Sequence, residues 1–320
     1  MKKDSLRIVY LGTPDFAVTS LNAIEEAGFL VVGVITMPDK PAGRGHKLKY
    51  SPVKEYALSH NLPLLQPQSL KDPDFLEELK AWQADVQVVV AFRMLPEAVW
   101  NMPKYGTINA HASLLPQYRG AAPINWAVIN GEDKTGITTF QLKHAIDTGD
   151  LLVQKEIDIH SSDNAGSVHD KLSVLAGKAL VQTLEQLINN QLQPKAQDHS
   201  KELKAAPKIF KEDCLLDFAK NPEELVQQIK GLSPYPAAFL SILDQNGKEK
   251  TIKVFDASTI KTEKSNQLPH LSIEEGEIHL IYNKGVIRLL ELQISGKKRM
   301  NAEAFLRGNQ QAISNSTIAI

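Results

Sequence analysis

The chain has 320 residues, 42% of them hydrophobic and 23% charged, so it is long enough to bury the cores of two ordinary domains. A formal net charge of −1 excludes bulk attraction to nucleic acid, and any such binding must come from local patches. The single cysteine, Cys214, excludes an internal disulfide and a cysteine-ligated metal site. No apolar run is long enough to cross a membrane, so we expect a cytoplasmic protein.

The first half of the chain alternates strands and helices. Nearly continuous runs of β-branched and apolar residues predict strands buried on both faces, as in a parallel sheet. The strands predicted in this way are 6–11, 30–36, 86–91 and 107–110. A long amphipathic helix over 167–189 closes the predicted domain, 1–189. The pattern predicts an α/β domain with a Rossmann-like, mostly parallel sheet, although no further glycine follows Gly12 at the dinucleotide-binding spacing.

The segment Pro38–Tyr50 interrupts this alternation. Its two prolines and two glycines predict a flexible loop without regular structure. It carries four basic residues against one acidic residue, and the basic ones are Lys40, Arg44, Lys47 and Lys49. A solvated surface loop is one interpretation of such a charge run. Long loops are often functional, however, and this one follows the second strand at the carboxyl edge of the sheet, where it could reach a polyanion.

Asn109 and His111 lie two residues apart on a predicted strand, so their side chains point to the same face. The carboxyl end of a strand is where open α/β sheets bind their ligands. An amide can donate a hydrogen bond to a carbonyl oxygen, and an imidazole can exchange a proton near neutral pH. The pair therefore suits chemistry at a carbonyl carbon. The alternative is that Asn109 caps a turn and His111 fills a pocket wall.

A second domain is predicted over 208–320, after a polar linker at 190–207 where the apolar periodicity fades. Asn221 and Pro222 begin a helix that Gly231 ends. Short strands follow at 238–243, 251–257, 277–282 and 286–294, which is the pattern of a small β-barrel. The charges of this domain are nearly balanced, so nucleic-acid binding would depend on patches, with solvated turns as the alternative. The candidate patches are Lys297-Lys298-Arg299, Lys208 and Lys211.

Five motifs of the first domain occur in the order typical of the folate-dependent formyltransferase family, which this chain resembles. They are Gly12-Thr13-Pro14-Asp15-Phe16-Ala17, Pro38-Asp39-Lys40-Pro41-Ala42-Gly43-Arg44-Gly45, Asn109-Ala110-His111-Ala112-Ser113-Leu114-Leu115-Pro116, Tyr118-Arg119-Gly120-Ala121-Ala122-Pro123 and Asp147-Thr148-Gly149-Asp150. The similarity continues at Ser233-Pro234-Tyr235-Pro236 and Gly296-Lys297-Lys298. The basic loop and the second domain resemble those of the tRNA-formylating members. Two positions depart from the family pattern: Ala112 replaces a common glycine, and the segment 91–96 is one residue shorter.

The resemblance implies that the formyl group of 10-formyltetrahydrofolate, a co-substrate, passes to the α-amine of methionine on charged initiator tRNA, without a metal. It implies that the catalytic residues are Asn109, His111 and Asp147. The implied folate-binding residues are Ser113, Leu114, Leu115, Pro116, Phe92, Arg93, Met94 and Leu95. The implied tRNA-binding residues are Arg44, Lys40, Lys47, Lys208, Lys297 and Lys298. The second domain would be OB-like, a fold that often binds nucleic acid, and we expect a monomer.

The implied chemistry agrees with these residue types. The formyl oxygen becomes negative in the tetrahedral intermediate, and the Asn109 amide and a protonated His111 are suitable donors to it. Asp147, through His111 or a water, could move the proton of the attacking amine to the leaving nitrogen, although a turn aspartate is the alternative. Two other functions stay open. A formyltransferase for small amines or sugar nucleotides would not need the basic loop or the barrel, and a non-catalytic RNA-binding protein would not need the three polar residues together.

Overall fold

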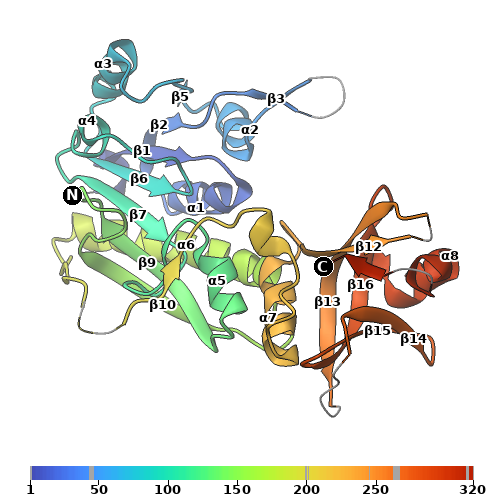
Figure 1. Ribbon diagram of the computed structural model, residues 1–320. Helices are drawn as coiled ribbons and strands as arrows, with labels where there is room; N and C mark the ends of the chain where they lie inside the picture. Colours follow the sequence, from blue (N-terminus) through green and yellow to red (C-terminus); the bar gives the residue numbers. More distant parts are fainter. Residues whose placement is uncertain are drawn as a thin grey trace. The chain divides into compact units, whose positions relative to one another are not determined.

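The computed structural model describes residues 2–42, 47–198, 200, 202–244, 246–261, 267–314 and 317–319 (Figure 1). Internal contacts divide the chain into two units. The first consists of Met1–Gly120, Thr135–Ile157 and His169–Ala205, and the second of Ala121–Lys134, Asp158–Val168 and Ala206–Ile320. The units are not continuous in sequence, because the stretches Ala121–Lys134 and Asp158–Val168 belong to the second unit, although they lie between segments of the first. Within the described ranges, no helix has both the length and the apolar character needed to span a membrane.

The first unit is built on a seven-stranded sheet with the order β10-β9-β7-β6-β1-β2-β5. Its strands are β1 (Arg7–Gly12), β2 (Leu30–Ile35), β5 (Leu64–Leu65), β6 (Val86–Val90), β7 (Thr107–His111), β9 (Lys134–Gln141) and β10 (Leu151–Asp158). The strands from β5 to β7 in this order pair in parallel, and β9 is antiparallel to β7. Every residue of β6 is buried, as its uninterrupted apolar run predicts. The predicted mostly parallel α/β sheet is confirmed.

Helices alternate with these strands along the chain, and the last helix follows β10. They are α1 (Asp15–Glu26), α2 (Pro52–Ser59), α3 (Pro73–Ala81), α4 (Glu97–Trp100) and the long α6 (Ala165–Ile188), with a 3₁₀ turn η1 (Lys3–Ser5) before β1. Ser51 and Asp72 cap α2 and α3, because their side chains accept hydrogen bonds from backbone N–H groups of the first turn. The register places Gly12 opposite Val90 and Val89 opposite Asn109. The carboxyl ends of β1, β6 and β7 therefore lie side by side at one edge of the sheet.

The basic segment differs from its prediction as a loop without regular structure. β3 (Lys40–Ala42) and β4 (Lys47–Lys49) pair as an antiparallel hairpin. Asp39, directly before β3, anchors the hairpin. Its side chain accepts hydrogen bonds from Lys54 and, at 2.9 Å, from Gln66. These two hydrogen bonds lower the pKa of Asp39. The prolines and glycines of this segment do not prevent three backbone pairs from forming between 40–42 and 47–49, so the prediction of a segment without regular structure was wrong for these residues.

The second unit is a β-barrel whose strands are β12 (Ala238–Leu243), β13 (Glu249–Ile260), β14 (His270–Glu274), β15 (Glu277–Tyr282), β16 (Gly285–Ile294) and β18 (Thr317–Ala319). Their order is β14-β15-β16-β13-β12-β18, and β17 (Met300–Asn301) pairs with β16. β14 and β18, at the two ends of this order, contact each other, so the antiparallel sheet is nearly closed. The predicted small barrel is confirmed.

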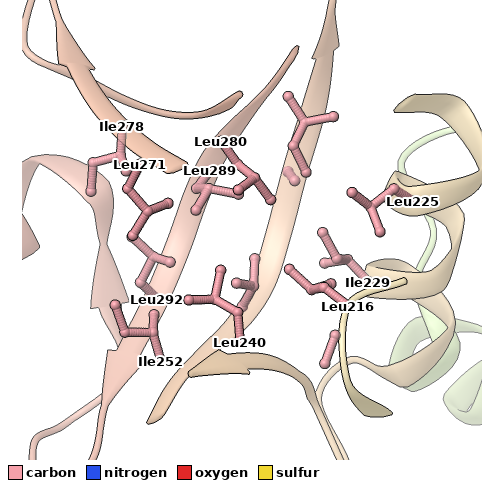
Figure 2. Close-up of a cluster of buried hydrophobic side chains, with 14 of the residues drawn as sticks. Leu216, Leu225, Ile229, Leu240, Ile252, Leu271, Ile278, Leu280, Leu289 and Leu292 are labelled. Carbon is pink, nitrogen blue, oxygen red and sulfur yellow. The ribbon is translucent and has the colours of Figure 1, made fainter. Parts of the chain in front are cut away.

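Among the described residues, the helices of this unit are α5 (Pro123–Ile129), α7 (Pro222–Leu232) and α8 (Ala302–Ser314). A short 3₁₀ turn, η2 (Glu212–Cys214), precedes α7. The N-terminus of α7 is a capping box, in which the Asn221 side chain and the Glu224 side chain each bond the other's backbone N–H. Leu225 and Ile229 of α7 point toward Leu240 and Leu289 of the barrel (Figure 2). The apolar face of α7 thus covers the barrel core.

Candidate active site

Asn109 and His111 lie on β7, between β6 and β9. The strand pairs Asn109 with Phe140 and His111 with Thr138 of β9. The Asn109 side chain is half-buried, and its amide has no hydrogen-bond partner within the part of the chain that the structure describes. His111 is 8% exposed. An amide with free donors therefore stands next to a nearly buried imidazole on the same face of one strand.

The proton position on His111 follows from its neighbours. Nε2 lies 2.8 Å from the carbonyl oxygen of Tyr118. Because a carbonyl oxygen can only accept, Nε2 carries a hydrogen in both the neutral and the charged ring. Nδ1 lies 3.9 Å from Oδ2 of Asp147, too far for a direct hydrogen bond and close enough for an ion pair or a bridging water. Nδ1 is therefore the ring nitrogen left without a direct hydrogen bond, and it faces a carboxylate.

Asp147 lies in the connection between β9 and β10 with a left-handed backbone, φ 53°. Its Oδ2 accepts a hydrogen bond of 3.0 Å from the backbone N–H of Gly120. The turn itself is closed by another side chain, since Thr148 Oγ1 donates to the carbonyl of Ala145 at 3.0 Å. The Asp147 carboxylate thus bonds a distant segment and not its own turn.

Gly149 allows this connection to lie against the sheet. A Cβ at this position would stand 1.6 Å from the backbone oxygen of Gln141 and 3.1 Å from the Phe140 ring. Only a residue without a side chain fits here, because real Cβ atoms do not approach below about 3 Å. The close packing of Gly149 against the sheet therefore fixes the position of Asp147, two residues earlier in the same connection.

The segment Tyr118–Gly120 bonds the side chains of both His111 and Asp147, and it includes β8 (Arg119–Gly120). The backbone carbonyl of Tyr118 accepts a hydrogen bond from Nε2–H of His111, and the backbone N–H of Gly120 donates one to Asp147. Tyr118 is itself left-handed, with φ 60°. Left-handed residues other than glycine cost about 1–3 kcal/mol each and persist where the surroundings fix them. Two such residues, Tyr118 and Asp147, meet around His111.

The four predicted folate residues after β7 divide into two kinds. Ser113 and Leu115 are buried, and Ser113 Oγ donates to the carbonyl of Gln117 at 2.7 Å. Leu114 and Pro116 are half-buried. The backbone of this segment is fixed on β9 by Thr138, which donates to the Ser113 carbonyl and accepts from Leu115 N–H. Only Leu114 and Pro116 present side-chain surface that a ligand could touch.

The predicted residues after β6 are also of two kinds. Phe92 and Leu95 pack into the apolar cluster of the sheet, and Met94 is 74% exposed. Arg93 donates to the carbonyls of Gln68 at 3.0 Å and Pro67 at 2.5 Å. Burial lowers the pKa of its guanidinium. Arg93 therefore ties two loops together at this edge.

The predicted tRNA-binding lysines of the second unit are exposed: Lys208, Lys297 and Lys298. The neighbouring Arg299 instead pairs with Glu291 and lies 4.3 Å from the centre of the Phe255 ring. Lys40 and Lys47 belong to the hairpin strands β3 and β4, while Arg44 lies outside the described residues. Over the described ranges, no three His, Cys, Asp or Glu side chains come together as metal ligands would.

Two residues of the site were not predicted from the sequence as site residues, Arg119 and Gln197. Gln197 lies in the segment expected to be a linker, yet it is only 7% exposed. Its Oε1 accepts from Arg119, at 3.1 Å from Nε. Burial lowers the pKa of Arg119, and the charge of Asp147 opposes that shift. A lone glutamine in a polar stretch carries no periodic signal, so nothing in the local sequence marks it.

Both halves of the chain match family models. Residues 6–184 match the formyl transferase family, and residues 208–310 match the formyl transferase C-terminal domain. The chain belongs to the formyl transferase family. Two relatives that span nearly its whole length are methionyl-tRNA formyltransferases. That of Bacteroides thetaiotaomicron is 53% identical, with 96% of this chain and 97% of the relative covered. That of Flavobacterium johnsoniae is 50% identical, with 95% and 96% covered.

Solved structures show the same fold at low sequence identity. HypX from Aquifex aeolicus in complex with tetrahydrofolic acid superposes with a TM-score of 0.62 at 18% identity, over 94% of this chain and 46% of that chain. WlaRD, a sugar 3N-formyl transferase in the presence of dTDP and 5-N-formyl-THF, also gives 0.62 at 18% identity, over 92% and 99%. These structures support the two-part architecture.

Proposed function

We propose that this protein transfers the formyl group of 10-formyltetrahydrofolate to the α-amine of methionyl initiator tRNA. The relatives named for this activity are about half identical to the chain and cover both of its matched regions. In the proposal, residues 1–189 hold the chemistry, 190–207 connect, and 208–320 bind tRNA. The protein would act as a cytoplasmic monomer.

The observation that carries the proposal is the arrangement of Asn109, His111 and Asp147. The methionine amine attacks the formyl carbon, a C–N bond forms, and the oxygen becomes negative. In the proposal the N–H donors of Asn109 bond this oxygen, and the position of Asn109 two residues before His111 on β7 supports this role. A preorganised donor of this kind is typical of oxyanion stabilisation.

In the proposal, His111 and Asp147 carry out the proton transfer. The tetrahedral intermediate then collapses: the C=O bond re-forms and the bond between the formyl carbon and the folate nitrogen breaks. The attacking nitrogen loses a proton and the leaving folate nitrogen gains one, so the overall charge is conserved. Nδ1 of His111 and the Asp147 carboxylate stand 3.9 Å apart, so a water can pass the proton between them. The Tyr118 carbonyl keeps Nε2 protonated throughout, which restricts the exchange to Nδ1.

For the folate, the residues present offer a fit. The half-buried Leu114 and Pro116 and the exposed Met94 supply apolar surface at the carboxyl edge, as small-molecule sites require. For the tRNA, the proposal uses Arg44, Lys40 and Lys47 of the hairpin segment, with Lys208, Lys297 and Lys298 on the second unit. Such cations neutralise phosphates and release counterions.

The test is a comparison of formyl acceptors at one concentration of 10-formyltetrahydrofolate. Charged initiator tRNA, uncharged initiator tRNA, methionine and an amino-sugar nucleotide are each supplied in turn. The proposal expects formyl transfer to charged tRNA alone. Transfer to the amino-sugar nucleotide with none to charged tRNA would contradict it.

A further inference from the structure

The segment 195–204, of which 195–198, 200 and 202–204 are described, lies within the stretch expected to be a linker. It nevertheless belongs to the first unit and bonds other parts of that unit near both of its ends. Lys195 exchanges backbone hydrogen bonds of 2.8 and 2.9 Å with Leu151, at the start of β10. Further along, the carbonyl of Lys204 accepts from the backbone N–H of Tyr118 at 2.6 Å. The segment therefore follows the two stretches that carry the site, 118–120 and 147–151.

Gln197 lies in the middle of this segment, and its amide is fully engaged. Nε2 donates to the carbonyls of Asp147 and Gly149, each at 2.8 Å. Oε1 accepts from Nε and Nη2 of Arg119. The orientation of the amide is unambiguous, because carbonyls can only accept and a guanidinium can only donate. A buried amide with all of these bonds made is a rigid connection.

These hydrogen bonds complete a connected set of contacts around His111 and Asp147. Tyr118 and Gly120 hold the side chains of His111 and Asp147, and Arg119 lies between them in the chain. Gln197 joins Arg119 to the backbone of Asp147 itself. Gln197 thus links the segment 118–120, which bonds the Asp147 carboxylate, to the β9–β10 connection, which contains Asp147.

We propose that Gln197 is a positioning residue for formyl transfer, which sets the separation of His111 Nδ1 and the Asp147 carboxylate by tying the Asp147 connection to Arg119. The inference rests on the proposed function, because it assumes that Asp147 takes part in the reaction. Gln197 is only 7% exposed, and its amide bonds the backbone of this connection, so in the proposal it acts through Asp147 and not by contact with a substrate.

The first test uses two substitutions of the same length. Gln197→Met removes all of the hydrogen bonds, while Gln197→Glu keeps the acceptor for Arg119 and places an oxygen against the carbonyls of Asp147 and Gly149. Both should lower kcat by roughly 10- to 10²-fold, the usual effect of displacing a reacting group by about 1 Å. KM for tRNA and for folate should change by less than about threefold, since no binding contact is lost. A Glu variant with the turnover of the unmodified protein would overturn the proposal.

A matched control is available in the second unit. Gln228 is 4% exposed, and its amide bonds backbone groups of Asp213, Leu215 and Asp217. Gln228→Met removes a comparably buried glutamine, and it should lower the melting temperature while leaving kcat unchanged. If it lowered kcat as much as Gln197→Met does, the effect would be a general loss of stability and the proposal would be wrong.

A double-mutant cycle with Asp147→Asn decides how Gln197 acts. If Gln197 acts through the Asp147 carboxylate, Gln197→Met should change kcat by less than about threefold once that carboxylate is gone, because residues that act as a unit are not additive. Independent, multiplicative effects would overturn the positioning role and leave the proposed function standing. Full activity of Asp147→Asn alone would overturn the proposed catalytic assignment, and the positioning role with it.

Discussion

The substitution Gly149→Ala tests whether the rate of formyl transfer depends on how closely the β9–β10 connection, which contains Asp147, packs against the sheet. The added Cβ would stand 1.6 Å from the Gln141 oxygen. Relieving this contact to about 3.0 Å requires a shift of about 1.4 Å, the difference of the two distances. Because this oxygen belongs to the end of β9 in the sheet, we expect the connection to move and not the strand. A shift of this size at the reacting groups lowers turnover by about 10²-fold.

The assay is formyl transfer to charged initiator tRNA at saturating concentrations of both substrates, with thermal unfolding measured alongside. Displacing the connection also breaks the bonds from Gln197 to Asp147 and Gly149, which costs about 1–3 kcal/mol of stability. Gly308→Ala is the control, since a Cβ there meets nothing within 4 Å. It should leave turnover unchanged and should not lower stability, because alanine is favoured over glycine in a helix such as α8. If Gly149→Ala turned over normally, the position of Asp147 would not matter and the reasoning would be refuted.

Four further substitutions address the other roles. Asn109→Ala should lower kcat by roughly 10²–10³, the loss typical of one oxyanion donor, with unchanged thermal stability; normal turnover would remove Asn109 from the mechanism. Asp147→Asn should lower kcat by roughly 10²–10⁴ and remove one limb of the pH–rate profile, and survival of both would leave Asp147 a turn residue. Arg44→Ala and Lys298→Ala, measured at two salt concentrations, should both weaken tRNA binding and its salt dependence without changing folate affinity. Unchanged tRNA parameters in Arg44→Ala would make the hairpin segment an ordinary surface element.

Local patterns predicted the elements whose cause is local. β6 is an uninterrupted apolar run and lies buried in the sheet, and the cap at Asn221 begins α7 as its residue type predicts. Asn109 and His111 could be placed on one face because a strand repeats every two residues. β14 and β18 were not predicted, since five and three residues of mixed character indicate nothing until a barrel edge pairs with them.

The part of the site that was not predicted depends on long-range contacts. The hydrogen bonds from His111 to Tyr118 and from Gly120 to Asp147 join positions 7 and 27 residues apart. Gln197 stands 50 residues from the carbonyl of Asp147 that it binds. A polar segment without periodicity is typical of a solvated linker, and only the folded chain shows that its glutamine is buried among partners. Composition reports how polar a segment is, and not whether its polar groups bond water or protein.

The fate of the formyl carbon tests the central claim most directly. The protein is mixed with 10-formyltetrahydrofolate labelled in the formyl carbon and with charged initiator tRNA, and the amino acid is then released from the tRNA and analysed by mass spectrometry. The account predicts that the label is found on the α-nitrogen of methionine, as N-formylmethionine, and that Asn109→Ala slows its appearance. Label that stays on the folate, or is found only as free formate while the tRNA-bound methionine remains unmodified, would contradict it.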